Sequence, residues 1–327
     1  MAACLRSIVT RRAGQAHCRP VQHPCMRWRI KSIGPCLTPR SAFFHRDIRL
    51  PCVRPKGKRT WMAHPQQLQF IRNVREHLAT DVSDKSILEV GSYDVNGSVR
   101  KFFPCRSYVG VDLTEGPGVD LVCAGDKLAL PDETFDLAIS SECFEHNPQW
   151  LETFLNMVRM TKSGGVVIFT CATTGRREHG TTRTSPNASP GTQSLGWDYY
   201  RNLTQKDFER HVDFDLLFES SFFLKNSYSF DLFFVGIKRG APPIFRFDAA
   251  QLKAECAAVA QAMRKEFEAK ERFPKALLIL GRATLVPVFL AAALPARLHR
   301  EFAYAYYKVT DMTKAPVKYV VGKILGR

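Results

Sequence analysis

Two carboxylates and a glycine-bearing loop stand where an α/β sheet can bind a nucleotide-like ligand. The apolar residues around Glu89 predict a buried strand, and the stretch from Gly91 to Gly97 predicts a tight loop after it. Glycine in such a loop lets the backbone and a ligand approach closely. Asp112 lies 21 residues after Gly91, at the end of a second apolar run, where its carboxylate can accept hydrogen bonds from ribose hydroxyls. No glycine lies between Gly91 and Gly97, so the G-x-G-x-x-G spacing of a dinucleotide-binding oxidoreductase is missing.

The elements that would hold these residues alternate between strands and helices. Helical spacing of apolar residues predicts helices over 65–78, 148–160 and 205–211. Apolar runs predict five strands, over 87–90, 108–112, 119–123, 135–140 and 166–171, followed by two more, over 216–223 and 229–238. This order predicts an α/β fold with a doubly wound, mostly parallel seven-stranded sheet that an antiparallel hairpin closes. A C-terminal helical extension is expected beyond the sheet.

Four motifs fall in the order and spacing of one protein family. They read LEVGSYDVNG, YVGVDL, FDLAISSECFEH and MTKSGGVVIFTCAT. In these motifs the chain resembles the class I S-adenosylmethionine-dependent methyltransferases, most of all their type 11 branch, over roughly residues 66–239. The resemblance implies a Rossmann-like sheet, S-adenosyl-L-methionine as the cofactor and methyl transfer to an acceptor. Many relatives read E-x-G-x-G-x-G, and here Tyr93 replaces the second glycine.

The resemblance also implies which residues bind the cofactor. Glu89 and Gly91 would set the loop against the amino-acid and sulfonium end, and Asp112 would bind the ribose hydroxyls. Asp126 would bond the adenine amino group, although a gapless alignment puts that acid at Ala124. The full set of implied cofactor-binding residues is Glu89, Gly91, Ser92, Tyr93, Asp94, Asp112, Leu113, Asp126 and Ser141.

Two histidines are candidate general bases, which methyl transfer to a hydroxyl group would require. His146 follows the fourth strand within the stretch 141–146, at the sheet edge where ligands bind, and is the first candidate. His179 is the second. It lies in the segment 172–202, which is too long for an ordinary connection and whose clustered aromatic and charged residues suit a substrate lid. A structural role for either histidine, and a solvated loop for the segment, remain alternatives.

The basic charge of the chain gathers at its two ends. Of a net charge of +16, residues 1–60 contribute +13 and residues 273–327 contribute +7, so residues 61–272 carry −4. This distribution argues against a broad nucleic-acid-binding face on the central domain. The ten cysteines form no C-x-x-C pair, so no metal site is expected, and scattered free thiols fit a reducing compartment.

Three regions follow: a basic extension over 1–60 that is expected to be disordered, a methyltransferase domain over 62–239, and a helical, basic region over 240–327. Prolines interrupt any long amphipathic helix in the first region, so a cytoplasmic location is expected, with a mitochondrial presequence as the alternative. The apolar run Ala276–Leu294 contains Arg282 and Pro287. A central arginine costs about 2.5–3.5 kcal/mol in a bilayer, so peripheral membrane contact through 273–327, or a soluble helical subdomain, is favoured over a spanning helix.

The expected activity is methyl transfer to a small metabolite, a glycan or a lipid-linked intermediate. The alternative is a catalytically silent, methyltransferase-like module that binds a membrane or a partner through its basic ends. The presence of both Glu89 and Asp112 argues against silence.

Overall fold

The chain is described here by a computed structural model over residues 65–78, 81–95, 97–246, 248–270 and 283–324. The extension predicted over 1–60 and the first part of the apolar run, 276–282, lie outside the described residues.

Seven strands in the described residues form one sheet in the order β3-β2-β1-β4-β5-β7-β6. Their bounds are β1 Ser86–Val90, β2 Ser107–Asp112, β3 Leu121–Val122, β4 Phe135–Ser141, β5 Thr161–Ala172, β6 Phe218–Asn226 and β7 Asp231–Lys238. The first five pair in parallel, and β7 runs antiparallel to both of its neighbours, β5 and β6. The predicted mostly parallel sheet with its closing hairpin is therefore confirmed.

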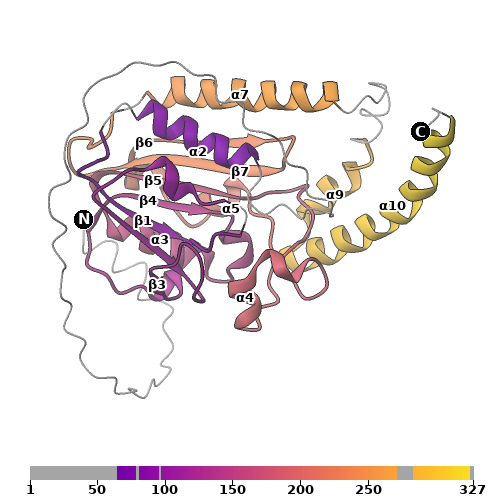
Figure 1. Cartoon of the computed structure of the whole chain (residues 1–327), viewed down its shortest axis with the longest axis horizontal. Helices are drawn as coiled ribbons and strands as arrows, with labels where there is room; N and C mark the ends of the chain where they lie inside the picture. Colours follow the sequence, from indigo (N-terminus) through magenta and orange to yellow (C-terminus); the bar gives the residue numbers. More distant parts are fainter. Residues whose placement is uncertain (1–64, 79–80, 96, 247, 271–282, 325–327) are drawn as a thin grey trace, which may run out of the picture. The chain divides into compact units, whose positions relative to one another are not determined.

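Helices cover both faces of this sheet (Figure 1). The helices α2 (Pro65–His77) and α7 (Ala249–Lys270) lie side by side over one face, and α3 (Trp150–Met160) and α5 (Gln205–Glu209) cover the other. Every residue of β1 and of β7 is buried. Strands that are covered on both faces are mostly apolar, which is why most residues of β1 and β7 are apolar and only a few buried polar residues, such as Glu89 and Asp231, interrupt them.

Two apolar clusters fill the space between the sheet and its helices. On the α3 side the rings of Phe154, Phe169 and Phe208 pack with their centroids 4.7–5.7 Å apart. On the α2 side Phe70 stacks on Phe233 at 4.3 Å, and Leu252 of α7 is fully buried in the same cluster. Burying each such side chain contributes about 1.5–3 kcal/mol to folding. The helix α7 is thus part of the core, although the methyltransferase domain was predicted to end at residue 239.

Beyond α7 the described chain is helical, with α9 (Val286–Leu290), the 3-10 turn η6 (Ala291–Ala293) and the long helix α10 (Ala296–Ile324). The side chains of α10 contact the segment 172–202. The Tyr307 hydroxyl donates to the Gly175 carbonyl at 2.8 Å, and Arg183 pairs with Glu301 at 2.7 Å. In the part of the chain that is described, no helix has both the length and the apolar character that crossing a bilayer requires.

Several element boundaries differ from the predicted ones. The strand β6 begins at Phe218 rather than at residue 216, because Asp213 caps the short helix α6 (Phe214–Leu217) by accepting a hydrogen bond from Leu216 N at 3.0 Å. The strand β3 is only two residues long, since only two of its residues pair with β2. The remaining short elements are η2 Val99–Phe102, η3 Gly125–Lys127, η4 Phe144–His146, η5 Pro186–Ala188 and α4 Pro190–Ser194.

Candidate active site

A pocket opens at the carboxyl ends of the parallel strands, where open α/β sheets bind their ligands. Its wall is built from the loop after β1, the ends of β2 and β4, and residues 189–192 and 197 of the long segment 172–202. The residues predicted from the sequence that line it are Glu89, Gly91, Ser92, Tyr93, Asp94, Asp112, Leu113, Ser141 and His146.

The loop after β1 forms a preformed cradle because of Gly91. This residue has a φ of 81°, which glycine adopts easily, and a Cβ at this position would lie 2.6 Å from the Cβ of Cys143. Gly91 N donates to the Val111 carbonyl of β2 at 2.9 Å. The other end of the loop is fixed by Asp94, whose carboxylate accepts a hydrogen bond from Gly97 N at 2.6 Å. Glycine at position 91 therefore lets the start of the loop pack directly against Cys143 in the pocket wall.

Asp112 ends β2 with its carboxylate in the pocket wall. One oxygen accepts a hydrogen bond from Tyr93 N at 3.0 Å and the other from Leu113 N at 2.7 Å. Burial raises the pKa of Asp112, and these two hydrogen bonds oppose the rise. Each carboxylate oxygen has a second lone pair, so Asp112 can accept further hydrogen bonds from the hydroxyls of a ligand.

Glu89, in the middle of β1, is the second carboxyl of the pocket. Its Oε2 accepts a hydrogen bond from the Tyr108 hydroxyl at 2.7 Å. Burial raises the pKa of Glu89 to about 8, and the hydrogen bond from Tyr108 only partly offsets it. Because a nearby positive charge favours the ionised form of a carboxyl group, this site suits a cationic group of a ligand.

Asp126 does not line the pocket, where the neighbouring residues Ala124 and Gly125 lie instead. Its carboxylate is turned toward Lys127 and pairs with it at 3.0 Å. Asp126 lies in the turn η3, where the preceding residue, Gly125, packs against the side chains of Val90 and Thr153. A Cβ at Gly125 would come within 2.7 Å of each. The contact predicted between Asp126 and adenine is not supported by this placement.

The segment predicted as a lid does reach the pocket. Residues 189–192 and Trp197 contribute to its wall. Gly191 lies directly against Asp112, since a Cβ on Gly191 would be 2.6 Å from the carboxylate oxygen Oδ1. The sequence identified the segment by its length and by an aromatic and charged cluster that includes Trp197. It did not single out residues 189–192, because a contact between the segment and β2 leaves no local pattern.

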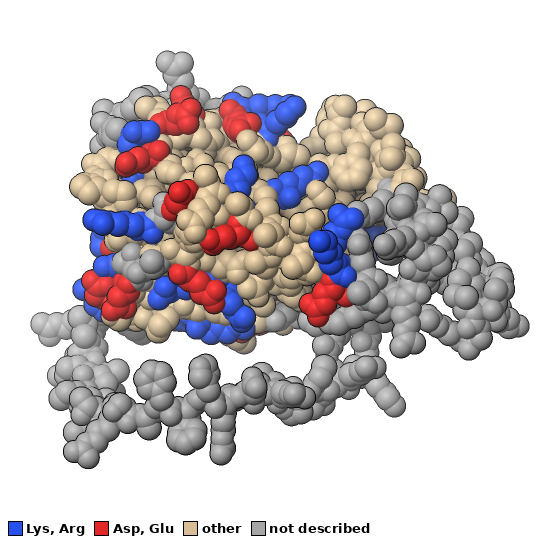
Figure 2. All heavy atoms as spheres, turned by 90° about the horizontal axis from the view of Figure 1, so that it is seen from above, with Lys and Arg blue, Asp and Glu red and all other residues tan. Residues whose placement is uncertain are grey.

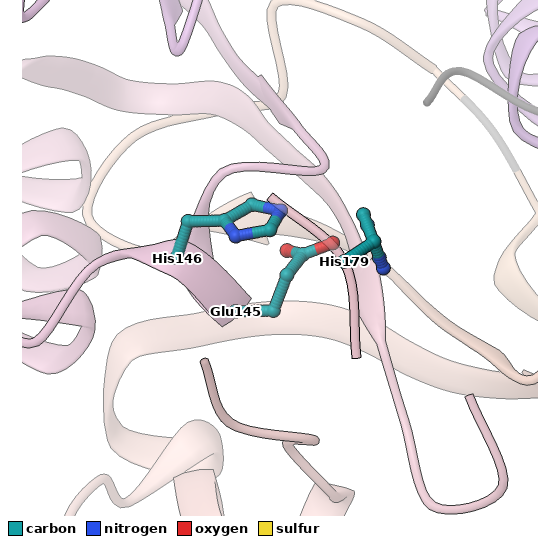
Figure 3. Close-up of side chains that lie close together, drawn as sticks. All are labelled: Glu145, His146 and His179. Carbon is teal, nitrogen blue, oxygen red and sulfur yellow. The ribbon is translucent and has the colours of Figure 1, made fainter. Parts of the chain in front are cut away.

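The two candidate bases lie against each other. The ring centroids of His146 and His179 are 4.9 Å apart at an interplanar angle of 84°, and the ring of Tyr200 packs on both, at 5.5 and 5.1 Å. Glu145, the neighbour of His146 in the turn η4, points its carboxylate between the two imidazoles (Figure 3). His146 lines the cofactor pocket, whereas His179 and Glu145 do not. The sequence presented the histidines as alternatives and gave no separate role to Glu145 or Tyr200. Glu145 belongs to the stretch 141–146, and Tyr200 belongs to the aromatic and charged cluster of the segment 172–202, both of which the sequence identified.

Burial dominates the electrostatics of this cluster. It lowers the pKa of His146 well below its usual range and that of His179 to about 4, so both rings are neutral at pH 7. It raises the pKa of Glu145 to about 7. The guanidinium of Arg176 lies close by and pairs with Glu142 at 3.6 Å and with Asp231 at 3.2 Å.

Residues 88–169, about a quarter of the chain, match the family model of a methyltransferase domain, that of the type 11 group. A comparison with curated proteins finds no match. Among solved structures, the chain is similar to YcgJ from Bacillus subtilis, with 13% identity and a TM-score of 0.38 over 54% of this chain and 100% of that one.

Two further solved structures are similar to the chain at the same level. One is the 1,6-didemethyltoxoflavin-N1-methyltransferase of Burkholderia thailandensis, with 14% identity and a TM-score of 0.37 over 52% of this chain and 79% of that one. The other is the phosphoethanolamine N-methyltransferase 2 of Haemonchus contortus, with 13% identity and a TM-score of 0.37 over 53% of this chain and 52% of that one.

The residues that line the pocket suit the chemical groups of the cofactor of this family. The loop after β1 lines the pocket, and the two carboxyls, Glu89 and Asp112, suit an ammonium group and a pair of hydroxyls. The buried hydroxyl of Ser92 has no hydrogen-bond partner among the described residues and lies in the pocket wall. Residues 88–169 therefore belong to the class I S-adenosylmethionine-dependent methyltransferases, type 11, and the cofactor of this domain is S-adenosyl-L-methionine.

Proposed function

We propose that the chain is an active methyltransferase that methylates a hydroxyl group of a small metabolite, a glycan or a lipid-linked intermediate. One observation carries this proposal. His146 lies in the wall of the cofactor pocket and, at the same time, contacts His179 and Tyr200 of the segment 172–202. A proton-accepting side chain therefore borders both the cofactor and the segment that would cover an acceptor.

When bound, S-adenosylmethionine supplies a methyl group on a sulfonium, which is a good leaving group. The chain then has to orient the acceptor, exclude water and accept a proton. Gly91 and Asp112 set the position of the cofactor through the cradle and the end of β2. His146 is a neutral base that could take the proton from the acceptor oxygen as the new bond to carbon forms. The segment 189–197 covers the pocket and would limit the access of water.

The acceptor class rests on the polar character of the space beside this pocket. A second cavity, between the segment 172–202, α5 and the start of α10, is lined mainly by polar and charged side chains. These include Arg176, Glu178, Arg201, Asp207 and Arg300. Such a lining favours an acceptor that carries several hydrogen-bonding groups, as a glycan or a phosphorylated intermediate does.

The test is turnover. The full chain is incubated with S-adenosylmethionine and a panel of hydroxyl-bearing metabolites, glycans and lipid-linked sugars, and formation of S-adenosylhomocysteine is measured. His146→Asn should lower the rate with an active acceptor by about 10²–10⁴-fold, the usual contribution of a general base. His211→Asn, which removes an exposed histidine outside the pocket, is the matched control and should leave the rate unchanged. A chain that binds the cofactor but turns over no acceptor would favour the silent binding module instead.

A further inference from the structure

Three side chains beside the cofactor pocket hold metal-ligating atoms without hydrogen-bond partners. The atoms are both carboxylate oxygens of Glu145, both ring nitrogens of His146, and Nε2 of His179, all shielded from solvent and unpartnered among the described residues. One ligand atom from each side chain lies within 4.8 Å of those from the other two, and Figure 3 shows the three side chains converging. A buried polar group without a partner costs about 1–3 kcal/mol, so five such atoms in one place indicate a ligand that they share.

The tautomer of His179 is fixed in the form that binds metal ions. Its Nδ1 lies 2.9 Å from the carbonyl oxygen of Arg177. A carbonyl only accepts hydrogen bonds, so Nδ1 must carry the proton and the Nε2 of the neutral ring offers its lone pair to the cluster. The Tyr200 hydroxyl donates to the same carbonyl at 3.0 Å. An imidazole held through its other nitrogen by a backbone carbonyl is the usual arrangement around metal-bound histidine.

Backbone geometry brings the ligands together from distant parts of the chain. Glu145 and His146 are adjacent in the turn η4, while His179 lies 33 residues after His146. Gly180 allows the close approach: its φ is 66°, and a Cβ there would lie 2.7 Å from Cε1 of His146. Metal bonds of about 2.0–2.2 Å would hold the three ligand atoms somewhat closer to one another than they lie here. Small side-chain rotations would bring them to that spacing.

We propose that Glu145, His146 and His179 bind a divalent transition-metal ion of the Zn²⁺ type beside the cofactor pocket. Two imidazoles and one carboxylate are a donor set that Zn²⁺ and Fe²⁺ accept, whereas Mg²⁺ and Ca²⁺ prefer oxygen donors alone. Three protein ligands leave a coordination position open, which an acceptor oxygen could fill. A metal-bound His146 has no free lone pair, so in the metal-bound chain the ion would activate the acceptor oxygen in place of His146 acting as the base. An ion can enter through the pocket, because His146 lies in its wall. The sequence predicted no metal site because it contains no C-x-x-C pair, and no short spacing joins His179 to Glu145 and His146.

The test measures metal binding directly, without turnover, so its outcome is independent of the methyl-transfer proposal. The full chain is treated with a chelator and titrated with Co²⁺, which gives a visible ligand-field spectrum, and then with Zn²⁺ as a competitor. We expect one Co²⁺ per chain, displaced by Zn²⁺. Glu145→Gln and His179→Asn should each weaken Co²⁺ binding by about tenfold or more. The matched controls Glu209→Gln and His211→Asn, which alter exposed residues of the same types, should not change it.

Folding of the variants is checked by their affinity for S-adenosylhomocysteine, since neither Glu145 nor His179 lines the cofactor pocket. Lack of stoichiometric Co²⁺ binding by the unmodified chain would overturn the proposal. So would folded Glu145→Gln and His179→Asn variants that bind Co²⁺ as tightly as the controls. If a variant fails to fold, the unmodified chain still decides: Zn²⁺ should protect His146 and His179 from diethyl pyrocarbonate, mapped by mass spectrometry, and equal modification with and without Zn²⁺ would refute the site.

Discussion

Asp112 offers the most direct test of how the pocket holds its cofactor. Its carboxylate lies in the pocket wall at the end of β2, and Asp112→Ala removes it without enlarging any side chain. Hydrogen bonds to a charged group contribute about 1.5–3 kcal/mol each. Loss of one net interaction of this size corresponds to about 10–150-fold weaker binding, since 1.4 kcal/mol is a factor of ten.

The same substitution also frees two backbone donors, Tyr93 N and Leu113 N, which the carboxylate holds at 3.0 and 2.7 Å. Their release would loosen the cradle, so part of the lost affinity would come from loop order rather than from direct contact. Asp120→Ala separates the two causes. Asp120 accepts hydrogen bonds from Gly110 N at 2.7 Å and from Arg100 at 2.9 Å, yet it does not line the pocket.

Calorimetric titration of the full-length variants with S-adenosylhomocysteine, together with their melting temperatures, makes this comparison. Asp112→Ala should bind 10–150-fold more weakly, by the estimate above of about 1.5–3 kcal/mol, while Asp120→Ala should lose stability but keep its affinity. If folded Asp112→Ala binds within about twofold of the unmodified chain, the assignment of Asp112 to the ribose is wrong. If both variants lose affinity equally, the effect belongs to the order of the β2 end and not to a contact with the cofactor.

Three further outcomes are expected. Burial raises the pKa of Glu89 to about 8, and the nearby carboxylates of Asp112 and Asp94 add to the rise, while Tyr108 and Arg100 oppose it. The carboxyl group of Glu89 is therefore protonated at pH 7. Binding of the cofactor's ammonium group should release that proton, so affinity should rise with pH up to about 8, and calorimetry in buffers of different ionisation enthalpy measures the release. Glu178→Ala should lower the free energy of unfolding by about 1.5–3 kcal/mol in a denaturant titration, because the part-buried guanidinium groups of Arg183 and Arg300 lose their charge-assisted hydrogen bonds to it, whereas Glu301→Ala should cost at most about 1 kcal/mol. The full chain should float with anionic vesicles and less so in high salt, and reversal of the exposed Arg297 and Lys308 to glutamate should weaken this.

Each of these outcomes has a clear opposite. Cofactor affinity that does not change between pH 6 and about 8, with no proton released, would show that Glu89 is already ionised in the free protein or does not meet the ammonium group. Equal free energies of unfolding for Glu178→Ala and Glu301→Ala would show that the ion pair with Glu178 does not stabilise the packing of α10 on the segment 172–202. A chain that floats with neither anionic nor neutral vesicles would leave region 273–327 as a soluble helical element, and the membrane proposal would be dropped.

The sheet could be predicted from the sequence because each of its signals is local. The strand β1, the turn at Gly91 and the acid at Asp112 follow one another within 27 residues, from Ser86 to Asp112, and their apolar runs are continuous. The distribution of charge on the surface is harder to predict from the sequence. On the face shown in Figure 2, the coloured lysine and arginine side chains are interspersed with acidic ones.

The cluster of Glu145, His146 and His179 could not be predicted, because it depends on where the fold places the segment 172–202. Spacing in sequence brings Glu145 and His146 together, but nothing local joins them to His179. Asp126 shows the opposite case: the family resemblance implied a contact with adenine, but in the structure its carboxylate pairs with Lys127 and does not line the pocket. Local patterns predict which strand a residue follows, while the direction of its side chain depends on neighbours from elsewhere in the chain.

The C-terminal helix α10 takes part in this positioning. Glu178, the residue before His179, accepts hydrogen bonds from Thr181, from Arg183 and, at 3.1 Å, from Arg300 of α10. Burial would raise the pKa of this carboxyl, but the hydrogen bonds hold it at about 2, so Glu178 is ionised and keeps its basic partners at neutral pH. Because the peptide that carries Glu178 also carries His179, α10 fixes one side of the histidine cluster without touching the cofactor pocket. Substitutions at Arg300, in a helix beyond the methyltransferase motifs, should therefore act on the position of His179 without touching the cofactor pocket.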